Sequence, residues 1–138
     1  MSQSLHLAIR TVHVLAMALL VGGAAGLWAA ARRRIDDLDV LARRYEWLFW
    51  AALGVLVVTG VGNLGALGAP GPGTRWGQTL LAKLVIVALF VLGSAVRTLA
   101  VTRTDRSTPL AAWGRRAYGL TTVTLLGLVV LAEVLAHG

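Results

Sequence analysis

Apolar residues in this chain occur in four long, continuous runs separated by short polar connections. The runs cover approximately Leu5–Ala31, Tyr45–Leu67, Trp76–Leu99 and Trp113–Ala136. A helix needs about 20 residues to cross a hydrocarbon core of about 30 Å, and each run is long enough to do so. Because the runs are continuous rather than alternating, they do not match membrane β-strands. The pattern therefore predicts an all-α integral membrane protein with four transmembrane helices.

The three connections are short, which favours neighbouring antiparallel helices. Residues 32–44 contain five Arg and three Asp and are compatible with a brief surface helix. Residues 68–75 form a Gly/Pro-rich turn. Residues 107–109, Ser-Thr-Pro, form a cap-then-proline signal that starts the fourth helix just before Trp113. Together these signals predict a single domain over residues 1–138, folded as an up-down-up-down bundle.

The composition agrees with a lipid environment. The chain is 57% hydrophobic and only 14% charged, whereas a soluble domain typically carries about 25% charged residues. The net charge of +7 comes from arginines at the ends of the apolar runs, a pattern that indicates membrane topology rather than nucleic-acid binding. The chain has no cysteine, which excludes disulfides and thiolate metal sites. The first run has its arginines after it, so we expect an uncleaved anchor rather than a signal peptide.

The arginines also predict the orientation of the chain. The first and third connections and their flanks hold ten of them, against Arg10 and Arg75 on the other side. The ten are Arg32, Arg33, Arg34, Arg43, Arg44, Arg97, Arg103, Arg106, Arg115 and Arg116. This bias predicts a multi-pass protein of the plasma membrane with both termini on the non-cytoplasmic side. Aromatic residues near the span ends fit interfacial belts: Trp28, Tyr45, Trp47, Trp50, Trp113 and Tyr118 at the inner side, and Trp76 at the outer side.

Each helix contributes one polar residue to the outer third of the membrane. These residues are His13, Asn63, Lys83 and Glu133, which lie about 21–28 Å from the inner arginine boundary at a rise of 1.5 Å per residue. Ionisable groups inside a span are costly and by default indicate function. A simpler interpretation treats Lys83 and Glu133 as a buried ion pair and Asn63 as a helix-packing contact. Equal depth does not fix helix rotation, so the convergence of the four residues is a hypothesis.

A second polar pattern lies on the first helix. His6, Arg10, His13 and Met17 follow one another at spacings of four, three and four residues, so they share one helix face. His6 and Arg10 are also suited to be interfacial anchors, and Met17 to be core filler. His137 shares a face with Glu133 but is next to the last residue. The hydroxyls of Thr59, Thr79 and Ser94 are expected to bond locally to helix backbone.

Three short motifs resemble the copper-resistance-D (CopD-like) membrane family. They are a histidine followed by a glycine pair, His13 with Gly22 and Gly23; the stretch VVTG at residues 57–60; and the LL-x-K-L stretch that contains Lys83. The chain also has a distant similarity to HemJ-type protoporphyrinogen oxidases. The aromatic-rich continuation of that family is absent after Gly23, which favours a CopD-like relative. The resemblance implies handling of copper or haem at His13 and Lys83.

The sequence is compatible with two different cofactors, a b-type haem or a copper ion. A b-type haem would use His13 as axial ligand, with Gly22 and Gly23 giving space. Arg10, Arg75 or Lys83 would then meet its propionates, and Glu133 would lie in the same layer. Lys83, His6 and His137 are alternative second axial ligands. Copper would instead use His6, His13 and Met17, with His137 as a further candidate ligand.

A third interpretation makes the chain a non-catalytic accessory subunit of a membrane redox complex. The expected partners are the lipid bilayer and either further copies of the chain, in a homo-oligomer, or the other subunits of such a complex. Whether the protein is an enzyme stays open. The sequence contains neither the nucleophile–base pair of a hydrolase nor the phosphate-binding loop of a kinase.

Overall fold

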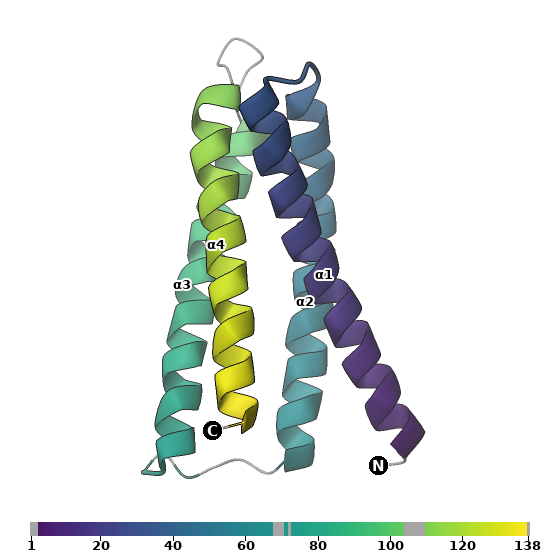
Figure 1. Cartoon of the computed structure of the whole chain (residues 1–138), viewed down its shortest axis with the longest axis vertical. Coiled ribbons are helices and arrows are strands. Elements are labelled where there is room, and N and C mark those ends of the chain that lie inside the picture. The colour runs from purple at the N-terminus through teal and green to yellow at the C-terminus, as the bar shows by residue number, and fades with distance from the viewer. Residues whose placement is uncertain (1–2, 68–70, 72, 104–109, 138) are drawn as a thin grey trace.

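The four predicted helices are present in the computed structural model and run up-down-up-down (Figure 1). They are α1 (Gln3–Arg33), α2 (Leu38–Leu67), α3 (Arg75–Arg103) and α4 (Leu110–His137). The structure describes residues 3–67, 71, 73–103 and 110–137, and of residues 63–67, 111 and 135–137 it describes the backbone alone. Each helix is long and apolar enough to cross a membrane. The predicted class, an all-α four-helix membrane bundle, is confirmed.

The α1–α2 turn is tighter than expected. No separate surface helix forms over residues 32–44, because α2 already begins at Leu38. Arg34 adopts a left-handed conformation (φ 51°), and the Ile35 amide donates a hydrogen bond to the Ala30 carbonyl at 3.3 Å. This bond joins residues five apart and closes the end of α1 as a Schellman motif does. The short turn holds α1 and α2 antiparallel and adjacent.

The Gly/Pro-rich segment ends in an N-cap. Thr74 Oγ1 accepts a hydrogen bond from the Gly77 amide at 3.0 Å, which satisfies one of the free donors at the start of α3. A side chain at Gly77 would lie 2.3 Å from the Gly71 carbonyl oxygen, so the close approach of the turn requires glycine there. The cap predicted at residues 107–109 lies outside the described residues. The described part of α4 begins at Leu110, three residues before Trp113.

Close packing of α1 against α2 forms the centre of the core. Tyr45 of α2 lies against Gly23, where an added Cβ would be 2.3 Å from the ring, and its hydroxyl donates to the Leu20 carbonyl at 2.8 Å. Small residues thus allow two helices to approach closely, as expected in a bilayer. Tyr45 and Tyr118, which were predicted near the inner interface, have their side chains buried in the core. Trp47, which is 83% exposed, fits the predicted belt.

Helix α3 is the least covered element. Only 6% of its most apolar stretch is buried within the chain, compared with 33% for α1.

Figure 1 also shows α1 diverging from its neighbours toward the N-terminus, so the bundle is closed at the end where α1 meets α2 and more open at the end that carries both termini. We call the first of these the arginine-rich end. The outward apolar surface of the helices therefore faces lipid, which is the environment the composition predicts.

Candidate functional site

His13 points from α1 toward α2, in the more open half of the bundle. Its Nδ1 atom lies 2.7 Å from the hydroxyl of Thr59. That hydroxyl has one proton and also lies 2.7 Å from the Val55 carbonyl, which competes with Nδ1 as its acceptor. When the proton goes to Val55, the Thr59 oxygen accepts a hydrogen bond from an Nδ1–H group. In this tautomer, Nε2 of His13 carries a lone pair and is the nitrogen available to a ligand.

The residues near His13 come from the other two motifs that carry the family resemblance. Thr59 and Gly60 belong to the VVTG stretch, and the position of a Cβ on Gly60 would be 3.8 Å from Cε1 of His13. Lys83, from the LL-x-K-L stretch of α3, is half-buried and near enough to His13 for the two groups to interact electrostatically. The packing of α1, α2 and α3 thus brings together residues far apart in the sequence.

The other described site residues lie along α1 and on α4. His6 and Arg10 are exposed on α1, and Met17 is half-buried against the core. Glu133 is exposed on α4. The alternative interpretation of Lys83 and Glu133 as an ion pair is not met, since the ion pair among the described side chains joins Glu46 and Arg97. The side chains of Asn63 and His137 lie outside the described residues.

The two glycines do not form the haem pocket beside His13 that the sequence suggested. Gly22 is nine residues from His13, which places it on the opposite face of α1 at 100° per residue. Gly23 faces the ring of Tyr45 instead of open space. Within the described part of the chain, no group of three or more His, Asp or Glu side chains could hold a metal ion. A metal ion at His13 would therefore have fewer than three carboxylate or imidazole ligands from the described residues.

A buried ion pair, which the sequence patterns did not indicate, links α2 and α3 near the arginine-rich end. Nε of Arg97 lies 2.8 Å from Oε1 of Glu46, and one terminal nitrogen lies 3.0 Å from Oε2. The two side chains are 4% and 1% exposed, so the pair is bidentate and almost fully desolvated. Arg97 was counted with the arginines of the third connection, and its pairing with Glu46 gives it a second explanation. The other nine arginines keep the asymmetry of charge.

Hydroxyl groups and rings complete this network. The Glu46 carboxylate also accepts hydrogen bonds from Tyr118 at 2.9 Å and from Thr98, so four donors satisfy it. Arg97 donates to Thr121 on α4 at 2.7 Å. Its guanidinium carbon lies 4.4 Å from the ring centroid of Phe49. Three helices thus surround the pair, and we call Glu46, Phe49, Arg97, Thr98, Tyr118 and Thr121 the Arg97 network.

The fold and these two polar centres define a multi-pass membrane protein of four helices. Residues 39–136 match the family described as Copper resistance protein D, and the chain belongs to this family. The match covers α2, α3 and α4, including Thr59, Lys83 and the Arg97 network, and α1 with His13 precedes it. Comparisons with curated proteins and with solved structures found no match. The similarity to HemJ-type enzymes stays a prediction.

Proposed function

We propose that this protein handles copper within the membrane and binds a Cu(I) ion through Nε2 of His13. The observation that carries the proposal is the hydrogen bond between His13 Nδ1 and Thr59, which orients the ring and leaves Nε2 free. Ligand histidines almost always use their other nitrogen in such a bond. Membership of the copper resistance protein D family supports the choice of metal.

The thioether of Met17 is the second ligand in this proposal. Met17 lies one helical turn from His13 on the same face of α1 and is half-buried. Cu(I) prefers soft sulfur and also accepts imidazole, so a His–Met pair suits it where a cluster of carboxylates would not. The exposed His6 lies seven residues before His13, on the same face, and can receive the ion at the membrane surface.

Metal analysis of the purified protein tests this function. Detergent-solubilised protein loaded with Cu(I) under reducing conditions should retain about one copper per chain after gel filtration, as one His13 site predicts. Its visible spectrum, oxidised and dithionite-reduced, should lack a Soret band. Protein that carries a Soret band with sharpened α and β bands on reduction would contradict the copper assignment and favour a b-type haem. Protein with neither signal would favour the accessory-subunit interpretation.

We also propose that both termini are non-cytoplasmic, so that His13 lies in the outer half of the membrane. The nine arginines outside the Arg97 network support this orientation through the positive-inside rule. A topology reporter fused after Gly138 should be active on the non-cytoplasmic side. A cytoplasmic signal from that fusion, with the same fusion stably inserted, would reverse the orientation.

A further inference from the structure

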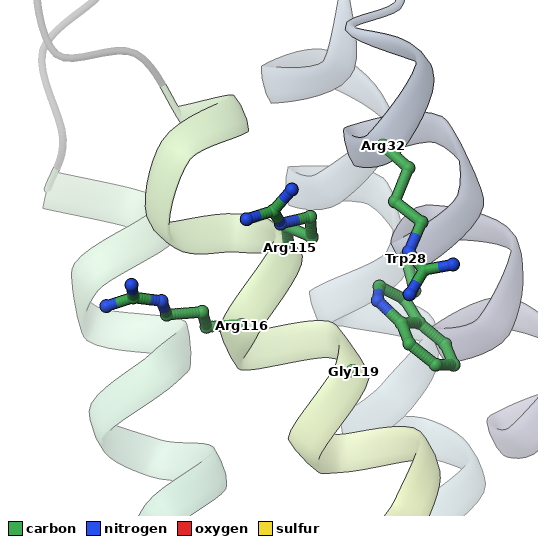
Figure 2. Close-up of a pocket in the computed structure, with 5 residues that line it drawn as sticks. All are labelled: Trp28, Arg32, Arg115, Arg116 and Gly119. Carbon is green, nitrogen blue, oxygen red and sulfur yellow. The ribbon is translucent and has the colours of Figure 1, made fainter.

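A cavity of about 510 Å³ opens between α1 and α4 at the arginine-rich end of the bundle. Its lining consists of Trp28, Arg32, Arg115, Arg116 and Gly119. Figure 2 shows Arg32 lying over the Trp28 ring and Arg115 on the facing helix, whereas the guanidinium of Arg116 points away from Trp28. The cavity lies apart from His13 and contains no residue of the Arg97 network.

Packing between α1 and α4 shapes this cavity. A Cβ on Gly119 would lie 3.0 Å from Nε1 of Trp28, so glycine lets the indole lie directly against α4. The guanidinium carbon of Arg32 lies 4.5 Å from the Trp28 ring centroid. This cation–π contact holds the charged group at the cavity and leaves its N–H groups free to donate. The donors are thus positioned by the fold.

The donors around the cavity lack a matching acceptor within the described part of the chain. Among the described side chains, the ion pair joins Glu46 and Arg97, so none of the cavity arginines takes part in it. Within the described part of the chain, the Nε1–H group of Trp28 donates no hydrogen bond. Uncompensated cations near one another repel, so an anion between them would be stabilised. Guanidinium groups match the oxygens of a phosphate, to which they donate two hydrogen bonds at once.

We propose that this cavity binds the phosphate group of an anionic phospholipid from the leaflet at the arginine-rich end. Tryptophan side chains favour the depth of the headgroups, and Trp28 is one turn from the arginines that mark the end of α1. Basic pockets between transmembrane helices bind anionic headgroups through the same chemistry. Arg32, Arg115 and the indole N–H donate to the phosphate. Arg116 contributes only to the local potential.

Native mass spectrometry of the intact protein in detergent tests the proposal. The protein is titrated with dioleoylphosphatidylglycerol and, separately, with dioleoylphosphatidylcholine. We expect the first adduct of phosphatidylglycerol to form with a dissociation constant about tenfold lower, the equivalent of one charge-assisted hydrogen bond. The double variant Arg32→Gln/Arg115→Gln should lose this preference. The matched control Arg33→Gln/Arg103→Gln removes two exposed arginines at the same end and should keep it.

A second variant separates shape from charge. Gly119→Val retains every arginine but fills the cavity beside Trp28, and it should also lose the preference for phosphatidylglycerol. Equal losses in the cavity and control double variants would show unspecific attraction and overturn the proposal. Equal binding of the two lipids by the unmodified protein would overturn it too. Displacement of phosphatidylglycerol by millimolar inorganic phosphate would identify a site for free phosphate instead of lipid.

Discussion

Replacing Arg97 with methionine should destabilise the bundle by about 3–5 kcal/mol, the usual consequence of removing one member of a buried ion pair. The variant leaves the carboxylate of Glu46 charged, 1% exposed and without its bidentate partner. The loss would be measured as the free energy of unfolding in mixed micelles of mild detergent and sodium dodecyl sulfate. Arg103→Met is the matched control, because Arg103 is exposed in the last turn of the same helix. It should change that free energy by less than about 1 kcal/mol.

The double variant Glu46→Leu/Arg97→Met should recover most of the lost stability. It removes both charges, so neither remains desolvated without a partner, and apolar replacements of buried pairs are often close to neutral. The recovery, expressed as a coupling free energy, reports the interaction between the two residues. A double variant as unstable as Arg97→Met alone would show that the cost comes from lost packing against Phe49 or from the unpaired hydroxyls of Tyr118 and Thr98, and not from the unpaired carboxylate.

The Arg97 network matters for stability because α3 has few other attachments. Only 6% of the apolar stretch of α3 is buried, and between apolar helices in lipid the hydrophobic effect provides little attraction. Polar contacts therefore carry a larger share of the association. Arg97 joins α3 to Glu46 of α2 and Thr121 of α4, and Thr98 of α3 accepts a hydrogen bond from Trp50 of α2 at 2.9 Å. We infer that these contacts set the rotation of α3.

The helices could be predicted from hydropathy, but their ends could not. A hydropathy pattern identifies the part of a helix inside the membrane, and a helix can continue beyond it. Helix α2 begins at Leu38 instead of near Tyr45 because Asp39, Arg43 and Arg44 form helical turns at the surface. The same limit explains why the burial of Tyr45 and Tyr118 could not be predicted. A sequence gives the depth of a side chain, whereas its direction depends on helix rotation, and both tyrosines face inward.

The two polar centres differ in how well the sequence reveals them. His13 and Lys83 are ionisable residues inside apolar runs, and they are near enough to interact electrostatically. Glu46 and Arg97 also lie inside the predicted runs, but close to arginine-rich ends, where charge has the alternative explanation of topology. Their opposite charges at similar depth on antiparallel helices are the signal that would have predicted a pair. Thr59 was expected to bond locally, and it does so while also accepting from His13.

Replacing Thr59 with valine should weaken Cu(I) binding by about 10- to 100-fold, if His13 is the ligand that we propose. Valine has nearly the same shape but cannot accept the hydrogen bond from Nδ1–H. The ring then loses the contact that fixes its orientation and its tautomer. Competition with a chromophoric Cu(I) chelator would measure the affinity. Thr59→Ser keeps the hydroxyl and should bind like the unmodified protein, whereas Thr79→Val removes a hydroxyl bonded only to its own helix at Arg75 and should have no effect.

Substitutions of the metal ligand and its charged neighbour complete this series. His13→Ala removes Nε2 and should abolish binding, while His6→Ala should slow loading and leave the affinity unchanged. Lys83→Met removes a positive charge near the bound cation, so we expect it to increase the affinity severalfold. A decrease would instead identify the Lys83 amine as a copper ligand. If Thr59→Val and Thr59→Ser weaken binding equally, the hydrogen bond to His13 has no part in it, and the proposed site is wrong.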